Sequence, residues 1–129
     1  MFDTNIWISG LLWRGKPHQC LLLARAGIVQ AVYCEEMVAE LATKLREVFG
    51  YSENHIQAVL YDLRRIAERV EIGGHLHAVA KDPDDDKFVE CAMVAGARTV
   101  VSGDRHLLDL AQVGEVSIVS AAEFLARFA

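Results

Sequence analysis

Short β-branched runs alternate along the chain with stretches whose apolar residues recur at helical spacing. Between Met37 and Val48, and again between Ile56 and Ala67, apolar residues return every three or four positions, which is typical of amphipathic helices. Strands separated by helices favour βαβ units, in which helices cover both faces of a mostly parallel sheet. The sequence therefore predicts an α/β fold, a three-layer α/β/α sandwich. The expected strands are residues 29–33, 70–72, 98–101 and 116–119.

Residues that favour helix ends support these boundaries. Pro17 suits the first turn of a helix and Gly27 suits its end, while Ser52 suits the cap before the second amphipathic stretch. Ser120, followed three residues later by Glu123, predicts a capping box for a final helix. The chain has 129 residues and shows no repeat or linker, so we expect one domain, residues 1–129.

Charge and cysteine content restrict the class of protein. The formal net charge is −5, which is unlike a protein that attracts nucleic acid through a basic surface. A nucleic-acid function would need metal ions that reverse the charge locally. Cys20, Cys34 and Cys91 are an odd, widely spaced set within apolar runs, so buried thiols are expected rather than disulfides. No run has the length of a membrane helix, and we expect a cytoplasmic protein without a membrane partner.

Acidic residues follow the expected strands. Asp3 comes directly after the two residues Met1 and Phe2, which can form only a short first strand, and Asp104 follows the strand at 98–101. An acidic run that contains Asp85 precedes another expected helix. Ligands of open α/β sheets gather at the carboxyl ends of strands, so these carboxylates are expected to converge there. Aspartate is also a favoured helix cap, and each of these residues alone can be explained as a cap.

The helix over Met37 to Val48 offers a further acid. Glu36 and Glu47 point furthest from its apolar stripe, whereas Glu35 and Glu40 both flank the stripe. Periodicity cannot choose between the last two. Glu40 also has an ordinary interpretation as a solvated residue that pairs with Lys44 one turn later.

These residues, taken in order, resemble the PIN-domain family, and in particular its toxin components of toxin–antitoxin pairs (VapC-like ribonucleases). The resemblance covers almost the whole chain, and its four weak motifs become fairly specific when they occur in one order. The matching stretches are Asp3-Thr4-Asn5, the residues 35–41, the acidic run up to Phe88, and Ser102-Gly103-Asp104-Arg105-His106-Leu107-Leu108.

The resemblance implies a Rossmann-like PIN fold and a Mg²⁺- or Mn²⁺-dependent ribonuclease. Its metal-binding and catalytic residues would be Asp3, Glu40, Asp85 and Asp104, with Asn5 and Ser102 in support. It also implies an RNA substrate and an antitoxin partner that covers the acidic site. The apolar excess of the two long helices suits a homodimer as well. The chain departs from the family at its very short first strand and at His106, which stands where a further acid is common.

Positive charge near the site has to attract the substrate. The sequence predicts that Arg14, Lys16, Arg105 and Lys87 lie near the mouth of the site. Lysine and arginine are the side chains that neutralise phosphates.

Two other classes of function compete with a nuclease. A receiver-type phosphoryl-transfer domain also collects aspartates at strand ends, but it places a lysine near the end of a late strand, and no lysine follows Lys87. A non-catalytic α/β binding module would use the acids only as caps. Stabilisation by a divalent metal separates these classes, because caps have no use for Mn²⁺.

Overall fold

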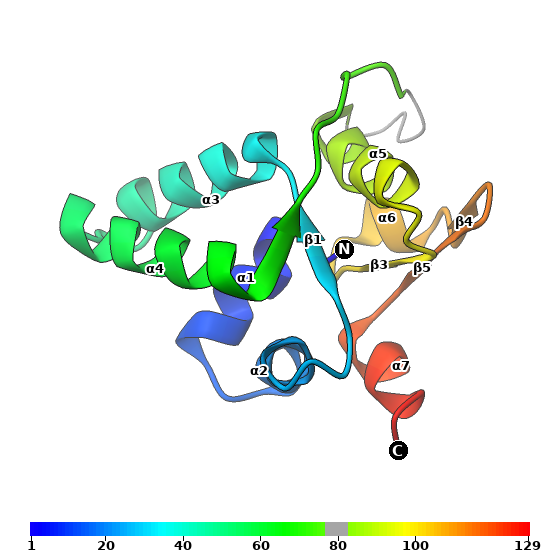
Figure 1. Cartoon of the computed structure of the whole chain (residues 1–129), viewed down its shortest axis with the longest axis horizontal. Coiled ribbons are helices and arrows are strands. Elements are labelled where there is room, and N and C mark those ends of the chain that lie inside the picture. The colour runs from blue at the N-terminus through cyan, green and yellow to red at the C-terminus, as the bar shows by residue number, and fades with distance from the viewer. Residues whose placement is uncertain (77–82) are drawn as a thin grey trace.

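The computed structural model describes residues 1–76 and 83–129. Figure 1 shows the strands between α5 on one side and α2 and α7 on the other, while α3 and α4 extend away from the sheet. This α/β arrangement confirms the predicted fold class. The helices are α1 (Thr4–Leu12), α2 (Lys16–Arg25), α3 (Glu35–Glu47), α4 (Glu53–Ile66), α5 (Asp86–Ala95), α6 (Arg105–Leu108) and α7 (Ala121–Ala126), with a 3₁₀ turn η1 (Pro83–Asp85).

The strands are short and form two groups. β1 (Ala31–Tyr33) pairs in parallel with β2 (Ala67–Arg69). β3 (Thr99–Val101) pairs in parallel with β5 (Val116–Val119), and β4 (Gln112–Val113) adds an antiparallel edge that the sequence pattern did not predict. Most of the pairing is therefore parallel, as expected.

The predicted strand at residues 70–72 was wrong by three positions. Strand pairing sets the position of β2, because Ala67 lies opposite Ala31 and Arg69 lies opposite Tyr33. The N–H of Val70 still donates to the carbonyl of Tyr33 at 2.8 Å, and there β1 has no further residue to pair. Ala67, which had been assigned to the end of the helical stripe, has extended backbone and begins the strand.

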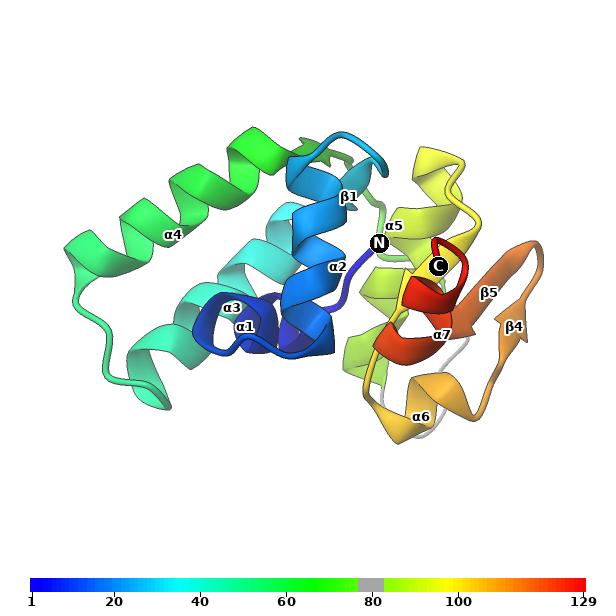
Figure 2. The same ribbon diagram turned by 90° about the horizontal axis from the view of Figure 1, so that it is seen from below.

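The first strand is reduced to one bridge. Phe2 pairs in parallel with Val101 of β3, and the N–H of Val101 donates to the carbonyl of Met1 at 2.8 Å. Phe2 and Trp7 are 2% and 0% exposed, and their rings meet edge to face. This packing fixes the start of α1 against β3. Figure 2 shows the N-terminal segment between the α1–α4 helices and the β3–β5 strands.

Most of the predicted helix ends are confirmed. Ser52 caps α4, and Ser120 and Glu123 form the reciprocal capping box of α7. Gly27 and Gly96 follow α2 and α5 with φ of 74° and 72°, a conformation that glycine adopts without strain. Val48 departs from the expected stripe, because α3 ends at Glu47 and leaves Val48 69% exposed.

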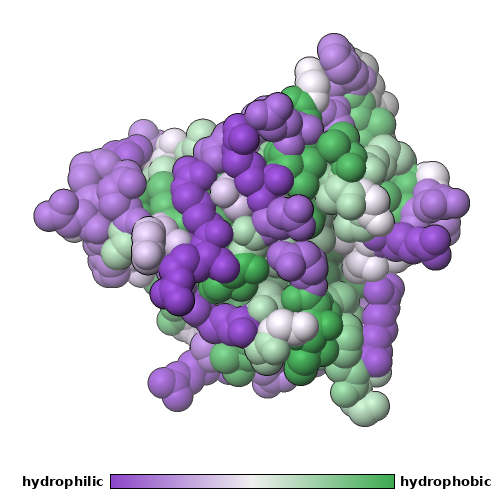
Figure 3. All heavy atoms as spheres, in the orientation of Figure 1, coloured by the Kyte–Doolittle hydropathy of each residue, from purple (hydrophilic) through white to green (hydrophobic). Residues whose placement is uncertain are grey.

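The surface and core agree with the predicted burial. Cys20, Cys34 and Cys91 are buried free thiols. Hydrophilic residues cover much of the face that carries α4 in Figure 3. None of the helices in residues 1–76 and 83–129 is both long and apolar enough to cross a membrane.

Candidate functional site

Asp3 lies where the first bridge ends and α1 begins. Its N–H donates to the carbonyl of Val101 at 3.1 Å, and its Oδ1 accepts the N–H of Ile6 at 2.9 Å as the cap of α1. The residue is only 2% exposed. Asp3 is thus both a helix cap, as the simpler interpretation predicted, and a buried carboxylate at the carboxyl edge of the strands.

Ser102 connects Asp3 to the end of β3. Its hydroxyl donates to Oδ2 of Asp3, and its own Oγ accepts the backbone N–H of Asp104 at 2.9 Å. Asp104 caps α6 by accepting the N–H of His106 at 2.7 Å. Two of the predicted acids therefore sit at one sheet edge, with the predicted supporting serine between them.

Glu40 reaches the same region from α3. Its Oε2 accepts the hydroxyl of Thr4 at 2.5 Å, and Thr4 is the residue after Asp3. Lys87 Nζ lies 3.5 Å from Oε2, and Lys44 Nζ lies 3.9 Å from Oε1. The carboxylate of Glu40 is therefore held by a hydroxyl and two ammonium groups.

Glu35 and Glu40 have different partners in the structure. Glu35 forms ion pairs with Arg64 on α4 and with Arg69 on β2. Those partners lower the pKa of Glu35, with the Arg64 hydrogen bond as the largest cause. Glu40, in contrast, contacts the first turn of α1. Glu36 and Glu47 are exposed, as periodicity predicted.

Asn5 and Asp85 complete the predicted set. The exposed Asn5 accepts a hydrogen bond from Lys44 Nζ at 3.2 Å, so it belongs to the rim of the site. Asp85 is buried in η1, directly before α5. Lys87, two residues further on, makes the 3.5 Å contact to Glu40, which brings this acidic segment beside α3.

Burial controls the electrostatics of Asp3. Loss of hydration raises its pKa to about 6, the charge of Asp104 adds to the rise, and the hydrogen bonds from Ser102 and Ile6 and the charge of Lys44 oppose it. A carboxylate that is buried beside another carboxylate is costly to ionise. A bound cation would reduce that cost.

The donor chemistry fits Mg²⁺ or Mn²⁺. Asp3, Glu40, Asp85, Asp104 and Ser102 offer hard oxygen atoms, which these ions prefer. Within residues 1–76 and 83–129, however, no three His, Cys, Asp or Glu side chains are close enough together to hold a metal ion. Lysines occupy the surroundings of Glu40 instead. The acids thus lie on neighbouring elements, but within the described residues they are too far apart to coordinate one metal ion together.

Two of the four cations that were expected at the mouth lie elsewhere. Asp3 precedes α1, whereas Arg14 and Lys16 follow its far end, roughly 14 Å along the helix axis. The prediction for this pair was wrong because it ignored the direction of α1. Lys87 does contact the site, and Arg105 begins α6 immediately after Asp104.

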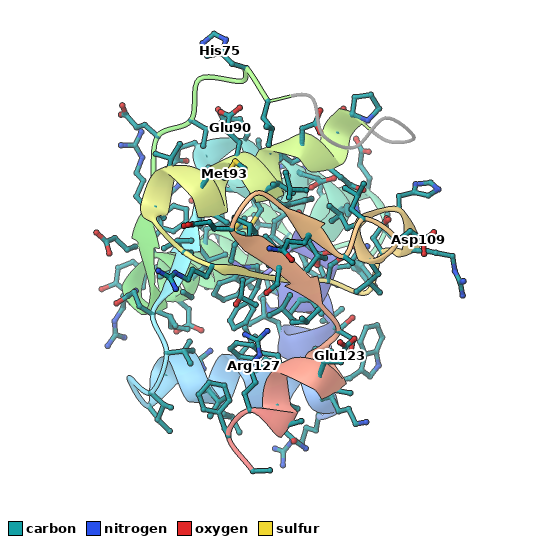
Figure 4. All side chains as sticks on the ribbon, turned by 90° about the vertical axis from the view of Figure 1, so that its right-hand side faces the viewer. His75, Glu90, Met93, Asp109, Glu123 and Arg127 are labelled. Atoms are coloured by element: carbon teal, nitrogen blue, oxygen red, sulfur yellow. The ribbon has the colours of Figure 1, made fainter. Side chains whose placement is uncertain are left out.

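The sequence analysis missed Thr4 and Glu90. Thr4 is 2% exposed, and its place in the Asp3-Thr4-Asn5 motif is the only signal that could have indicated a role. Glu90 is buried on α5 and accepts the N–H groups of Gly74 and Leu76, both at 2.8 Å. Figure 4 shows Glu90 pointing toward the loop that carries His75, while His75 points away from the molecule. In the sequence, Gly73 and Gly74 before the acidic run were the feature that could have indicated a loop folded around a carboxylate.

Two histidines near the acidic segments, His106 and His75, are exposed. His106 is exposed on α6, with its Nδ1 4.0 Å from Oδ1 of Asp104. His75 and His77 are separated by one residue, a spacing that resembles a metal pair in a strand; His75 is exposed, and His77 falls outside the described residues, as does Asp82 at the start of the acidic run. Neither described histidine carries an argument for a metal site.

Comparison with known proteins agrees with the geometry. A family model described as PIN domain matches residues 1–106, which is most of the chain and includes every predicted site residue. No curated protein and no solved structure gave a significant match. The chain belongs to the PIN-domain family, whose members are generally nucleases.

Proposed function

We propose that this protein is a metal-dependent endoribonuclease and the toxin of a toxin–antitoxin pair. The observation that carries the proposal is the convergence of acids at the start of α1. Ser102 joins Asp3 to Asp104, and Thr4, the neighbour of Asp3, holds Glu40. Asp3 and Asp104 thus lie at one edge of the strands, which is where α/β proteins bind ligands, and Glu40 reaches the first turn of α1 from α3.

Asp3, Glu40, Asp85 and Asp104 would hold one or two Mg²⁺ or Mn²⁺ ions. When bound, these ions would supply an acidified water and positive charge for the departing oxygen of the phosphodiester. Ionisation of Asp3 is costly in the metal-free protein because its pKa is about 6. Divalent cations and protons therefore compete for the same carboxylate.

The side chains around the acids define the rest of the chemistry. The hydroxyl proton of Ser102 is committed to Asp3, and its oxygen accepts the N–H of Asp104, so Ser102 orients both acids and is not a nucleophile. Water is then the attacking group. Asn5 and Lys44 form a polar rim through which a phosphate can approach.

Surface features support the proposed protein partners. Leu22 on α2 and Phe128 after α7 are 46% and 44% exposed, and both line a groove between these helices. An amphipathic antitoxin segment or a second copy of the chain in a homodimer would bury such groups. The groove lies on α2 and α7, which differs from the two locations expected from the sequence, namely the acidic site for the antitoxin and the two long helices for the homodimer.

The decisive experiment is cleavage of a mixed RNA with and without Mn²⁺. The wild-type chain should cut RNA in Mn²⁺ and not in EDTA, and Asp104→Asn should lose cleavage while it keeps the cap of α6, because asparagine caps as well as aspartate does. Ser120→Ala is the matched control: it removes the cap of α7 and should cost stability without loss of cleavage. Equal cleavage by Asp104→Asn and wild type would refute the proposal.

A further inference from the structure

The two lysines beside Glu40 differ in their surroundings. Lys87 has a side chain that is 16% exposed and lies between three groups of the protein. Its Nζ is 3.5 Å from Glu40 Oε2, donates to the carbonyl of Asp84, and sits 4.8 Å from the centre of the Phe88 ring. Lys87 is therefore an internal cation whose donors point at the protein.

Lys44 is placed differently. Its side chain is 35% exposed, and within the described part of the chain its ammonium group makes one hydrogen bond, to Asn5 Oδ1 at 3.2 Å. The 3.9 Å separation from Glu40 Oε1 is an ion pair beyond hydrogen-bond distance. An ammonium group has three N–H donors, so Lys44 keeps donors for a ligand that comes from solvent.

Lys44 places a positive charge where a substrate phosphate would approach the acids. Its nitrogen lies at the rim of the acid site, and its charge reaches Asp3, whose pKa it lowers against the stronger effects of burial and Asp104. The chain as a whole is negatively charged, so a polyanion depends on local cations at this rim. Both present partners of Lys44 are weak and can be exchanged for a phosphate oxygen.

We propose that Lys44 is a substrate-positioning residue, which binds a backbone phosphate of single-stranded RNA next to the scissile bond, while Lys87 remains with Glu40. The inference rests on the proposed function. It assigns a phosphate subsite to Asn5 and Lys44, on the solvent side of Glu40. A cation that leaves Glu40 for a phosphate also frees that carboxylate, so substrate binding and metal binding would assist one another at this position.

The test measures RNA binding without metal. In an Asp104→Asn background that does not cut, a labelled single-stranded RNA is titrated in EDTA over a series of salt concentrations. Lys44→Gln should weaken binding roughly tenfold at low salt and make the slope of log K against log salt shallower by about 0.7, the effect of one lost phosphate contact. Lys44→Arg should restore most of the affinity and the slope.

Two controls separate a phosphate contact from a structural role. Arg65→Gln removes the same charge from α4, where Arg65 lies over the Tyr61 ring, and should leave the slope unchanged. With Asp104 intact, stabilisation of Lys44→Gln by Mn²⁺ should equal or exceed that of the wild type, because the variant lacks an ammonium group that competes with the metal for Glu40. If the wild type cleaves RNA but Lys44→Gln keeps the salt slope of the Asp104→Asn background, the Lys44 assignment alone is overturned. A wild type that does not cut RNA, together with a background that does not bind it, overturns the proposed function and this inference together.

Discussion

The hydroxyl of Ser102 donates to Oδ2 of Asp3, and the oxygen of the same hydroxyl accepts the N–H of Asp104. One fully buried side chain therefore sets the positions of two acids that are a hundred residues apart. Ser102→Ala should remove both bonds and leave the partly buried N–H of Asp104 and the buried carboxylate of Asp3 less satisfied, at a cost of about 2–3 kcal/mol in the free energy of unfolding. Urea denaturation measures this cost, and cleavage should fall with it. Ser102→Thr, which keeps the hydroxyl, should retain more stability than the alanine variant; equal losses would contradict the assigned role.

The raised pKa of Asp3 predicts a specific pH dependence of stability. The folded pKa is about 6, against 3.8 as the ordinary value, so between these values the folded state binds more protons than the unfolded state. Stability therefore falls as pH rises through this window, by at most about 3 kcal/mol. Asp3→Asn stays neutral and should be more stable than wild type above pH 6 and similar to it below pH 4. The difference between the two urea-denaturation profiles isolates Asp3 from other titrating groups, and a constant difference would disprove the shift.

Much of the site could be predicted from the sequence because strand ends and caps are local features. Asp3 and Asp104 each follow a strand, and parallel strands bring such residues to one edge of a sheet. The sequence pattern alone could not distinguish Glu40 from Glu35. Both flank the same stripe, and only the packing of α3 against α1 on one side and α4 on the other separates them.

The two wrong predictions, the position of β2 and the location of Arg14, both depend on how elements pack against one another. Residues 70–72 are more apolar than residues 67–69, yet β2 forms at Ala67–Arg69 because β1 offers its partners there. Arg14 was placed near the acids although α1 carries it away from Asp3. Hydrophobic pattern and residue type predict which elements exist; pairing register and helix direction depend on contacts between elements.

Metal binding should appear as thermal stabilisation that depends on Glu40. A ligand that binds only the folded state at a hundred times its Kd stabilises by about 2.7 kcal/mol, which raises the melting temperature of a domain of this size by several degrees. Glu40→Gln should remove most of the increase that Mn²⁺ produces. Glu47→Gln, the same change at an exposed position of the same helix, should show the full wild-type increase. Equal responses of both variants would mean that Mn²⁺ binds elsewhere.

Glu90 should hold the loop from Gly73 to Leu76 in its folded conformation. Burial acts to raise the pKa of its carboxyl, but the N–H donors of Leu76 and Gly74, assisted by those of His75 and Gly73, lower the pKa below its usual range. Glu90→Gln should destabilise the fold by about 2–4 kcal/mol, because at least one charge-assisted bond is lost and a second is weakened. Urea denaturation at neutral pH measures the loss, with Glu68→Gln, at an exposed position of β2, as the matched control.

The contribution of Glu90 also has a predicted sign with pH. Because its folded pKa is lowered, the unfolded state binds the proton more readily, and the stabilisation is present above the unfolded pKa and lost as pH falls through the folded value. The gap between wild type and Glu90→Gln should therefore close in acid. At neutral pH its sign is opposite to that for Asp3, because the wild type is the more stable protein here and the less stable one there. Asp85 directly precedes α5, the helix that carries Glu90, so Glu90→Gln should also weaken Mn²⁺ stabilisation at neutral pH, although Glu90 is no ligand. A variant with reduced stability but an unchanged Mn²⁺ response would limit Glu90 to holding the loop.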